Sequence, residues 1–102
     1  MDAAVKNYEE ALTIKPGYVK AHNNLGNTFI ALGQLDDAVK SFKKALTLKP
    51  DYAEAHNNLG NAFKALGQLD DAFKSYEKAL THKPDYPEAK NNLDIVLKEL
   101  SS

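Results

Sequence analysis

The sequence predicts an all-α protein in which short helical hairpins stack along one axis. Residues 18–51 and 52–85 are two copies of one 34-residue unit that differ at eight positions. Within each copy, apolar residues recur at steps of three and four, which places them on one face of a helix. A unit that encodes two helices cannot bury its apolar face alone, so neighbouring units must stack.

The repeat extends over nearly the whole chain, which we interpret as a single domain of 102 residues. Residues 1–17 match the second half of the unit, and residues 86–102 match its first half. We therefore expect six helices, near residues 2–15, 18–32, 35–49, 52–66, 69–83 and 86–100.

Each unit contains one apolar stripe per helix. In the first copy these stripes are Ala21, His22, Leu25, Phe29 and Leu32, followed by Leu35, Ala38, Val39, Phe42, Ala45 and Leu46. Gly33 and Gly67 should end the first helices, because glycine tolerates the left-handed conformation. Pro50 and Pro84 should stop the second helices.

Two further local predictions concern caps and close packing. Asp51 precedes Glu54 by three residues, which indicates a capping box, and Asp85 and Glu88 repeat it. Gly17 replaces the aspartate at the first junction and predicts a weaker cap. The small residues Gly26 and Ala38, with Gly60 and Ala72 in the next copy, should let two helix backbones approach closely.

Composition excludes several functional classes. Thirteen basic residues nearly balance 14 acidic ones, so no basic excess favours nucleic acid or a membrane surface. No apolar run approaches the roughly 20 residues that span a bilayer. Cysteine is absent, which removes disulfides and thiolate chemistry. A cytoplasmic location is the default expectation, because no export signal is visible.

The spaced residues of the unit closely resemble the tetratricopeptide repeat. The first copy carries His22, Leu25, Gly26, Phe29, Ala38, Phe42 and Pro50, and the second carries His56, Leu59, Gly60, Phe63, Ala72, Tyr76 and Pro84. Histidine stands where the family usually has tryptophan or tyrosine. The resemblance implies a right-handed α-solenoid of antiparallel helix pairs whose first helices line the concave side. It also implies an adaptor that holds peptides or partner helices there.

Asparagines occupy the face opposite the apolar stripe of the first helices. They are Asn23, Asn24 and Asn27, then Asn57, Asn58 and Asn61, and finally Asn91 and Asn92. Asparagine costs about 0.5 kcal/mol relative to alanine inside a helix, so their number suggests a use. Each amide offers both a donor and an acceptor, and can bind the N–H and C=O of an extended peptide.

We predict that Asn24, Asn58 and Asn92, spaced by 34 residues, form a ladder that binds a peptide backbone, helped by Asn23, Asn27, Asn57 and Asn61. The ladder is similar to that in the repeat arm of O-linked N-acetylglucosamine transferases. This similarity leaves open that the chain is a substrate-recruiting fragment of a larger enzyme. The simpler interpretation is that the asparagines solvate a helix face and bond between neighbouring repeats.

The family also has a dicarboxylate clamp, which grips the C-terminal carboxylate of chaperones with two asparagines and three basic residues. Asn27 and Asn58 fit the asparagine positions. The basic positions hold Asn23, Glu88 and Asn92, and Glu88 would repel a carboxylate. We therefore do not expect this mode.

No residue pattern predicts catalysis, a metal or a cofactor. We interpret His22 and His56 as packing residues and His82 as an isolated surface residue. Asp36–Asp37 and Asp70–Asp71 lie in the first turn of predicted helices, where negative charge favours the helix dipole.

The terminal helices raise a second hypothesis, a structural solenoid that self-associates head to tail or by helix exchange. Near the start, Val5, Tyr8 and Leu12 lack the usual partner helix and should be partly exposed. Near the end, exposure is expected among Ile95, Val96, Leu97 and Leu100, and Asp94 replaces the close-packing glycine. Excision from a longer repeat array would explain the same pattern.

Overall fold

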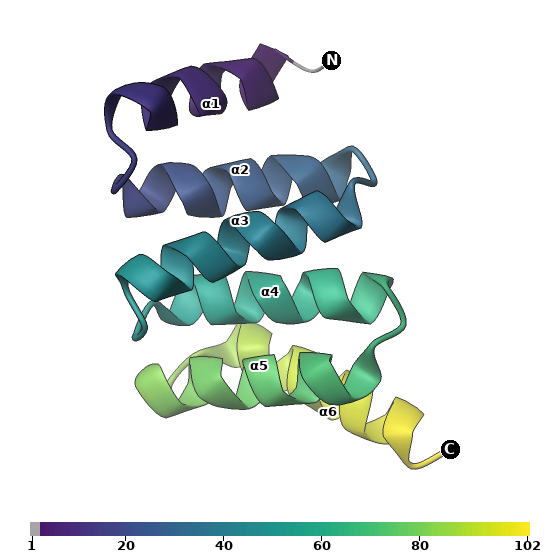
Figure 1. Ribbon diagram of the computed structural model, residues 1–102. Helices are drawn as coiled ribbons and strands as arrows, with labels where there is room; N and C mark the ends of the chain where they lie inside the picture. The colour runs from purple at the N-terminus through teal and green to yellow at the C-terminus, as the bar shows by residue number, and fades with distance from the viewer. Residues whose placement is uncertain (1–2) are drawn as a thin grey trace.

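The computed structural model describes residues 3–102 as a row of antiparallel helices, with no strand in that range. Figure 1 shows α3 and α5 nearer the viewer, with α6 behind α5, in a stack that measures 44 × 26 × 18 Å. The six helices are α1 (Ala3–Ile14), α2 (Val19–Ala31), α3 (Leu35–Leu48), α4 (Ala53–Ala65), α5 (Leu69–His82) and α6 (Pro87–Leu100). The predicted all-α solenoid is confirmed. Within residues 3–102, no helix is long and apolar enough to span a membrane.

The core follows the predicted stripes except at Leu32, and it also contains Val5, which was expected to be partly exposed. Phe42, Tyr76 and the small residues beside them are fully buried. Leu32 is 42% exposed, because α2 ends before it and Leu32 takes the C-cap position. Val5 is only 3% exposed, contrary to expectation, because it joins the cluster around Leu25 and Phe29.

The last helix also differs from expectation at one position. Val96 is fully buried in a cluster with Ala72 and Tyr76, whereas Ile95, Leu97 and Leu100 are exposed. One face of α6 therefore packs on α5, and its apolar residues on the other faces reach solvent.

The turns confirm the helix-ending glycines but not the capping boxes. Gly33 and Gly67 have φ of 75° and 79°, the left-handed region that glycine adopts without strain. The predicted capping boxes are wrong, because α4 and α6 begin after Tyr52 and Tyr86 with no side-chain cap bond. Asp51 and Asp85 stand one residue too early, in the turns that follow the prolines.

A lysine–tyrosine contact recurs at each of these turns and was not predicted. The ammonium of Lys49 lies 5.2 Å from the centre of the Tyr52 ring. The same pair recurs one unit earlier and one unit later, as Lys15–Tyr18 at 5.3 Å and Lys83–Tyr86 at 4.5 Å. Cation–π contacts at exposed sites contribute about 0.5–1 kcal/mol, so the contact helps fix each turn.

The close approach at the glycines involves an aromatic ring rather than a second backbone. A Cβ placed on Gly26 would lie 2.5 Å from the Phe42 ring, and one placed on Gly60 would lie 2.5 Å from the Tyr76 ring. Both rings are fully buried and have no room to move away. The ring of each second helix thus lies directly on the backbone of the helix before it.

Replacing Gly60 with valine should destabilise the protein by about 2–3 kcal/mol, because overpacking a close-packed core forces strain. Chemical denaturation measures this loss. Ala65→Val is the matched control, since Ala65 is an exposed position of the same helix and carries the same β-branched penalty. Equal stability of the two variants would contradict the packing argument.

The Tyr76 hydroxyl donates a hydrogen bond of 2.6 Å to the Asn61 side-chain oxygen. Burial, with smaller contributions from the negative charges of Glu88 and Glu99, raises the pKa of Tyr76 from 10.0 to about 12. The folded state therefore keeps this proton at a pH where the unfolded chain has lost it. Stability that depends on Tyr76 is complete below pH 10 and is lost as pH rises towards 12.

Tyr76→Phe, which copies the residue at position 42, should cost about 1 kcal/mol at neutral pH through the lost hydrogen bond. It should also reduce the loss of stability between pH 10 and 12, because the raised pKa is removed. Denaturation midpoints measured across that range test both effects. Identical slopes in the two proteins would rule out a titrating Tyr76.

Candidate functional site

The predicted site residues all lie on α2, α4 and α6, but they divide into a buried and an accessible set. Asn23 is 7% exposed and Asn57 is fully buried. Asn24 and Asn27 are exposed, whereas Asn58, Asn61 and Asn92 are half-buried. The Asn57 side chain was expected to line an open groove, but it is buried beneath the surface. It therefore supports its neighbours instead.

Hydrogen bonds between helices connect the two sets. Asn58 donates to the Asn23 side-chain oxygen at 3.1 Å, and Asn92 donates to the Asn57 oxygen at 3.1 Å. The bonds therefore join residues 35 apart. These bonds confirm one part of the simpler interpretation, that asparagines bond between neighbouring repeats. Asn24, Asn58 and Asn92, which are 34 apart, are not bonded to one another by their side chains in the described structure.

Asn61 receives two further donors. It accepts the Tyr76 hydroxyl at 2.6 Å and the Asn92 amide at 3.4 Å. Asn27 is the equivalent residue of the first unit, where Phe42 stands at the position of Tyr76 and offers no hydroxyl. The second unit thus orients its amide more firmly than the first.

Asn57 retains an unusual buried group. Its Nδ2 has no hydrogen-bond partner of good geometry among the described residues, although its oxygen is bonded to Asn92. Burial raises the pKa of the nearby Tyr86 phenol, and the Asn57 amide lowers that pKa by a smaller amount. A buried donor without an acceptor costs about 1–3 kcal/mol, so Asn57 carries a stability cost inside the helix stack.

The histidines are packing residues, as predicted. His22 and His56 are each 7% exposed, and their Nε2 atoms lie 2.8 Å from the carbonyl oxygens of Pro16 and Pro50. A carbonyl only accepts, so Nε2 carries the proton in both residues. Each histidine therefore ties a first helix to the turn that precedes it.

His82 is not isolated, contrary to expectation. Its ring stacks on His56 with centroids 5.5 Å apart and planes inclined by 18°. The sequence carried one signal of this pair, because position 82 differs from the equivalent Leu48. The 26-residue separation crosses two helices, so the contact could not be read from helical spacing.

The two aspartate pairs lie at the starts of second helices. Asp36–Asp37 and Asp70–Asp71 lie exposed in the first turns of α3 and α5, as predicted. No group of three or more histidine, aspartate or glutamate side chains in that range could hold a metal ion.

Known structures share the fold closely. A structure described as the first TPR of Spaghetti (RPAP3) bound to HSP90 peptide SRMEEVD is 26% identical, with a TM-score of 0.93 over 96% of this chain and 78% of that chain. The first TPR domain of human RPAP3 is 26% identical, with a TM-score of 0.92 over 95% of this chain and 76% of that one. The Sgt2 TPR domain from Aspergillus fumigatus, at 23% identity, has a TM-score of 0.91 over 95% of this chain and 66% of its own, which shows the fold alone.

Family models match most of the sequence, whereas no curated protein matches it. The model described as TPR repeat matches residues 1–33 and 26–67, and the model described as Tetratricopeptide repeat matches residues 53–86. Together with the stacked helix pairs, these matches show that the chain belongs to the tetratricopeptide repeat family.

Proposed function

We propose that this chain is a protein-interaction module that binds an extended peptide along the asparagine face of α2, α4 and α6. The observation that carries the proposal is the pairing of accessible amides with buried ones. Asn58 and Asn92 are held by Asn23 and Asn57 at 3.1 Å, so they are oriented before a ligand arrives. Preorganised groups lose less entropy on binding.

The remaining hydrogen-bonding capacity suits a peptide backbone. Asn58 uses one N–H for Asn23, and its side chain keeps a second N–H and a carbonyl oxygen. Asn24 and Asn27 are exposed and present whole amides. An extended peptide offers alternating N–H and C=O groups, which such amides can bind without reading side chains. Each bond nets about 1 kcal/mol, so we expect weak affinity, roughly micromolar or worse.

The structure of Spaghetti (RPAP3) with an HSP90 peptide supports a peptide as the ligand class. Carboxylate-directed binding is disfavoured here, because Asn23, Glu88 and Asn92 occupy the positions that a dicarboxylate clamp needs to be basic. The chain should therefore depend on the backbone of its peptide more than on a terminal carboxylate. No step of this function requires catalysis or a cofactor.

Asn24→Ala combined with Asn27→Ala should abolish peptide binding while leaving stability nearly unchanged, because both side chains are exposed and outside the inter-helix hydrogen bonds. Binding is measured on an array of short unstructured peptides that includes SRMEEVD with free and amidated C termini. Asn58→Ala should lose binding too, with some loss of stability, since it leaves buried Asn23 without its donor.

Asn7→Ala is the matched control, because Asn7 is an exposed asparagine on α1, outside the proposed face. If the double variant bound the array as well as Asn7→Ala did, the asparagine face would not be the binding site. A requirement for the free C terminus of SRMEEVD would instead indicate a carboxylate-directed mode.

Self-association is a second candidate function, favoured by the exposed apolar residues of α6. Ile95, Leu97 and Leu100 are 37%, 41% and 41% exposed. Leu97 and Leu100 lie three residues apart on neighbouring sides of the helix, so they can bury together against the surface of a second copy, whereas Ile95 lies on another side. The proposed product is a structural solenoid that is longer than one chain.

Leu97→Glu with Leu100→Glu should shift the protein towards monomer if α6 mediates such contacts, since charge at an apolar interface is costly. Sedimentation velocity over a concentration series measures the shift. Leu48→Glu controls for an exposed leucine on a central helix. A wild-type protein that stays monomeric at high concentration would exclude this function.

A further inference from the structure

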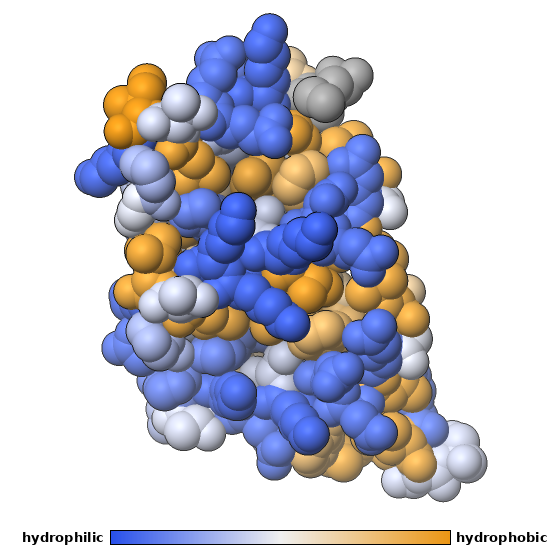
Figure 2. Space-filling view, viewed as in Figure 1, coloured by the Kyte–Doolittle hydropathy of each residue, from blue (hydrophilic) through white to orange (hydrophobic). Residues whose placement is uncertain are grey.

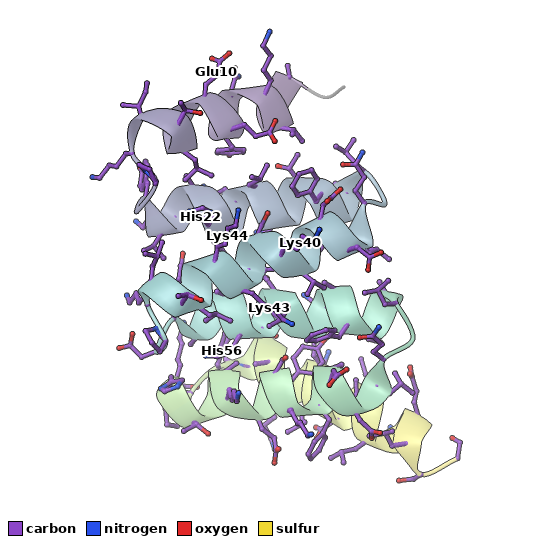
Figure 3. All side chains as sticks on the ribbon, viewed as in Figure 1. Glu10, His22, Lys40, Lys43, Lys44 and His56 are labelled. Carbon is purple, nitrogen blue, oxygen red and sulfur yellow. The ribbon has the colours of Figure 1, made fainter. Side chains whose placement is uncertain are left out.

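Two equivalent grooves lie between the second helices of neighbouring units. We call them the His22 groove, between α1 and α3, and the His56 groove, between α3 and α5. Figure 3 shows His22 and His56 in this order down the stack, with Lys40, Lys43 and Lys44 on α3 between them. The asparagines of α4 do not line the His56 groove, so it is separate from the proposed peptide face.

The grooves share a framework but differ in charge. Each has a histidine, a proline, two leucines, a threonine, a serine and a lysine at positions related by 34 residues. Glu9 of the His22 groove becomes Lys43 in the His56 groove, and Leu48 beside His22 becomes His82 beside His56. Each of the two changes adds a basic group, and one also removes a carboxylate.

Among residues 3–102, no carboxylate lines the His56 groove. Its volume is about 580 Å³. Its titratable lining residues are Lys43 from α3, His56 from α4, and Lys78 and His82 from α5. Ser75 adds a hydroxyl group to the same lining, whereas the Thr47 hydroxyl donates to the Lys43 carbonyl oxygen at 2.8 Å.

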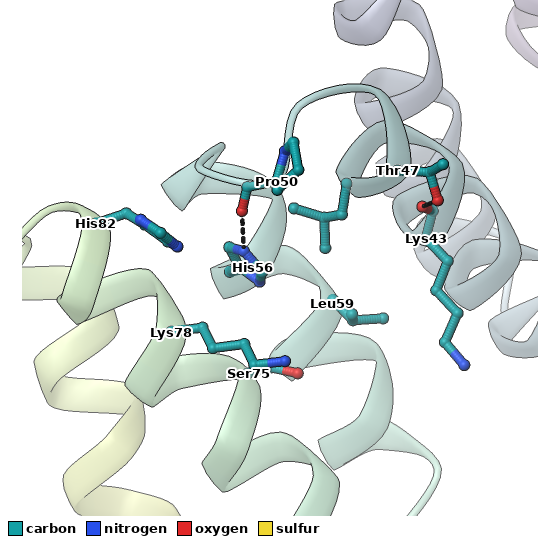
Figure 4. A pocket seen from close by; sticks show the side chains of 9 residues that line it. Lys43, Thr47, Pro50, His56, Leu59, Ser75, Lys78 and His82 are labelled. Carbon is teal, nitrogen blue, oxygen red and sulfur yellow. Dashed lines mark hydrogen bonds between the residues drawn. The ribbon is translucent and has the colours of Figure 1, made fainter.

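Figure 4 shows His56, His82 and Lys78 around the mouth of this groove, with the His56–Pro50 bond dashed. Because Nε2 of His56 is already committed to Pro50, protonation adds a hydrogen at Nδ1 and creates a new donor. The stacked His82 ring, 5.5 Å away, supplies a second imidazole. Two protonated imidazoles at this distance would repel one another, and an anion beside them would offset that repulsion.

We propose that the His56 groove binds a phosphate group through His56, His82 and Lys78. Cationic donors that line one groove without a carboxylate match the oxygens of phosphate. Lysine in the lining opposes a metal cation, for which two histidines alone would be an incomplete ligand set. The site goes beyond peptide binding and does not depend on it.

The surrounding charges set the limits of the site. The Lys43 ammonium lies 5.9 Å from the centre of the Phe63 ring and must swing from it to reach the anion. His82 also borders a second depression that contains Asp51 and Glu54, together with Lys20, Lys49 and Lys83. Glu54 is 4.0 Å from Lys83, which offsets part of its charge. Figure 2 shows hydrophilic side chains gathered over α3 on this face, with hydrophobic atoms between them and at the edges.

Binding should strengthen as pH falls. Burial lowers the pKa of His56; the Pro50 hydrogen bond opposes this shift, and the positive charges of His82 and Lys78 add to it. An anion would favour the protonated form, so its binding takes up a proton. Sulfate is a suitable probe for the pH profile, because it keeps the same charge over the range in which histidine titrates.

The test follows the imidazole NMR signals of the three histidines while inorganic phosphate replaces chloride at constant ionic strength. His56 and His82 should show saturable shifts, and His22 should not. The affinity for sulfate should rise as the pH is lowered through the histidine range. A phosphoserine derivative blocked at both ends distinguishes a phosphate ester from the free ion: tighter binding than inorganic phosphate identifies an ester as the ligand, and weaker binding identifies the free ion.

Matched variants separate a built site from general positive charge. His82→Leu, which copies Leu48, should lower the affinity for phosphate at least about tenfold, because one charge-assisted hydrogen bond is lost. Lys78→Gln should weaken it similarly, whereas Lys40→Gln, an equal loss of charge outside the groove, should not. Glu9→Lys with Leu48→His should create binding at His22.

Two results would overturn the proposal. Parallel, unsaturated shifts of all three histidines would show ordinary ion screening. Unchanged affinity in His82→Leu, with an unchanged circular dichroism spectrum, would show that the stacked pair takes no part.

Discussion

The contact between an aromatic ring and a glycine backbone is the constraint on which the rest of the structure depends. Phe42 and Tyr76 are fully buried and lie where any Cβ on Gly26 or Gly60 would collide with them. The ring can bury itself completely only because the first helix offers bare backbone there. This contact fixes the separation of each helix pair.

The asparagines bond diagonally between successive units. A repeat of 34 residues suggests that equivalent side chains meet, yet the bonds connect Asn23 to Asn58 and Asn57 to Asn92. Successive first helices are evidently displaced enough for each amide to reach the residue before its counterpart. One amide of each pair becomes buried and orients the other. The packing of the core and the presentation of the accessible amides are therefore one arrangement.

Features that depend on the spacing of residues within one helix or turn can be predicted from the sequence. Contacts that depend on how far neighbouring helices are displaced cannot. Helix positions, the buried stripes and the ends at Gly33 and Gly67 follow from residues within one helix or turn. The Asn23–Asn58 bond and the His56–His82 stack join helices whose relative displacement no spacing reveals. The capping boxes failed because a turn after proline moves the helix start by one residue.

Near-identity of the two units makes their differences informative. The framework repeats so closely that the His22 and His56 grooves have equivalent prolines, leucines, serines and threonines. Packing alone does not require Lys43 and His82, because the first groove forms the same framework with Glu9 and Leu48. The exposed His82 nevertheless stacks on a buried histidine beside Lys78. Burial lowers the pKa of His56, and the charges of His82 and Lys78 lower it further at an electrostatic cost. An anion in the groove would turn that cost into an attraction, whereas the first groove, with its carboxylate, has no such charge to neutralise.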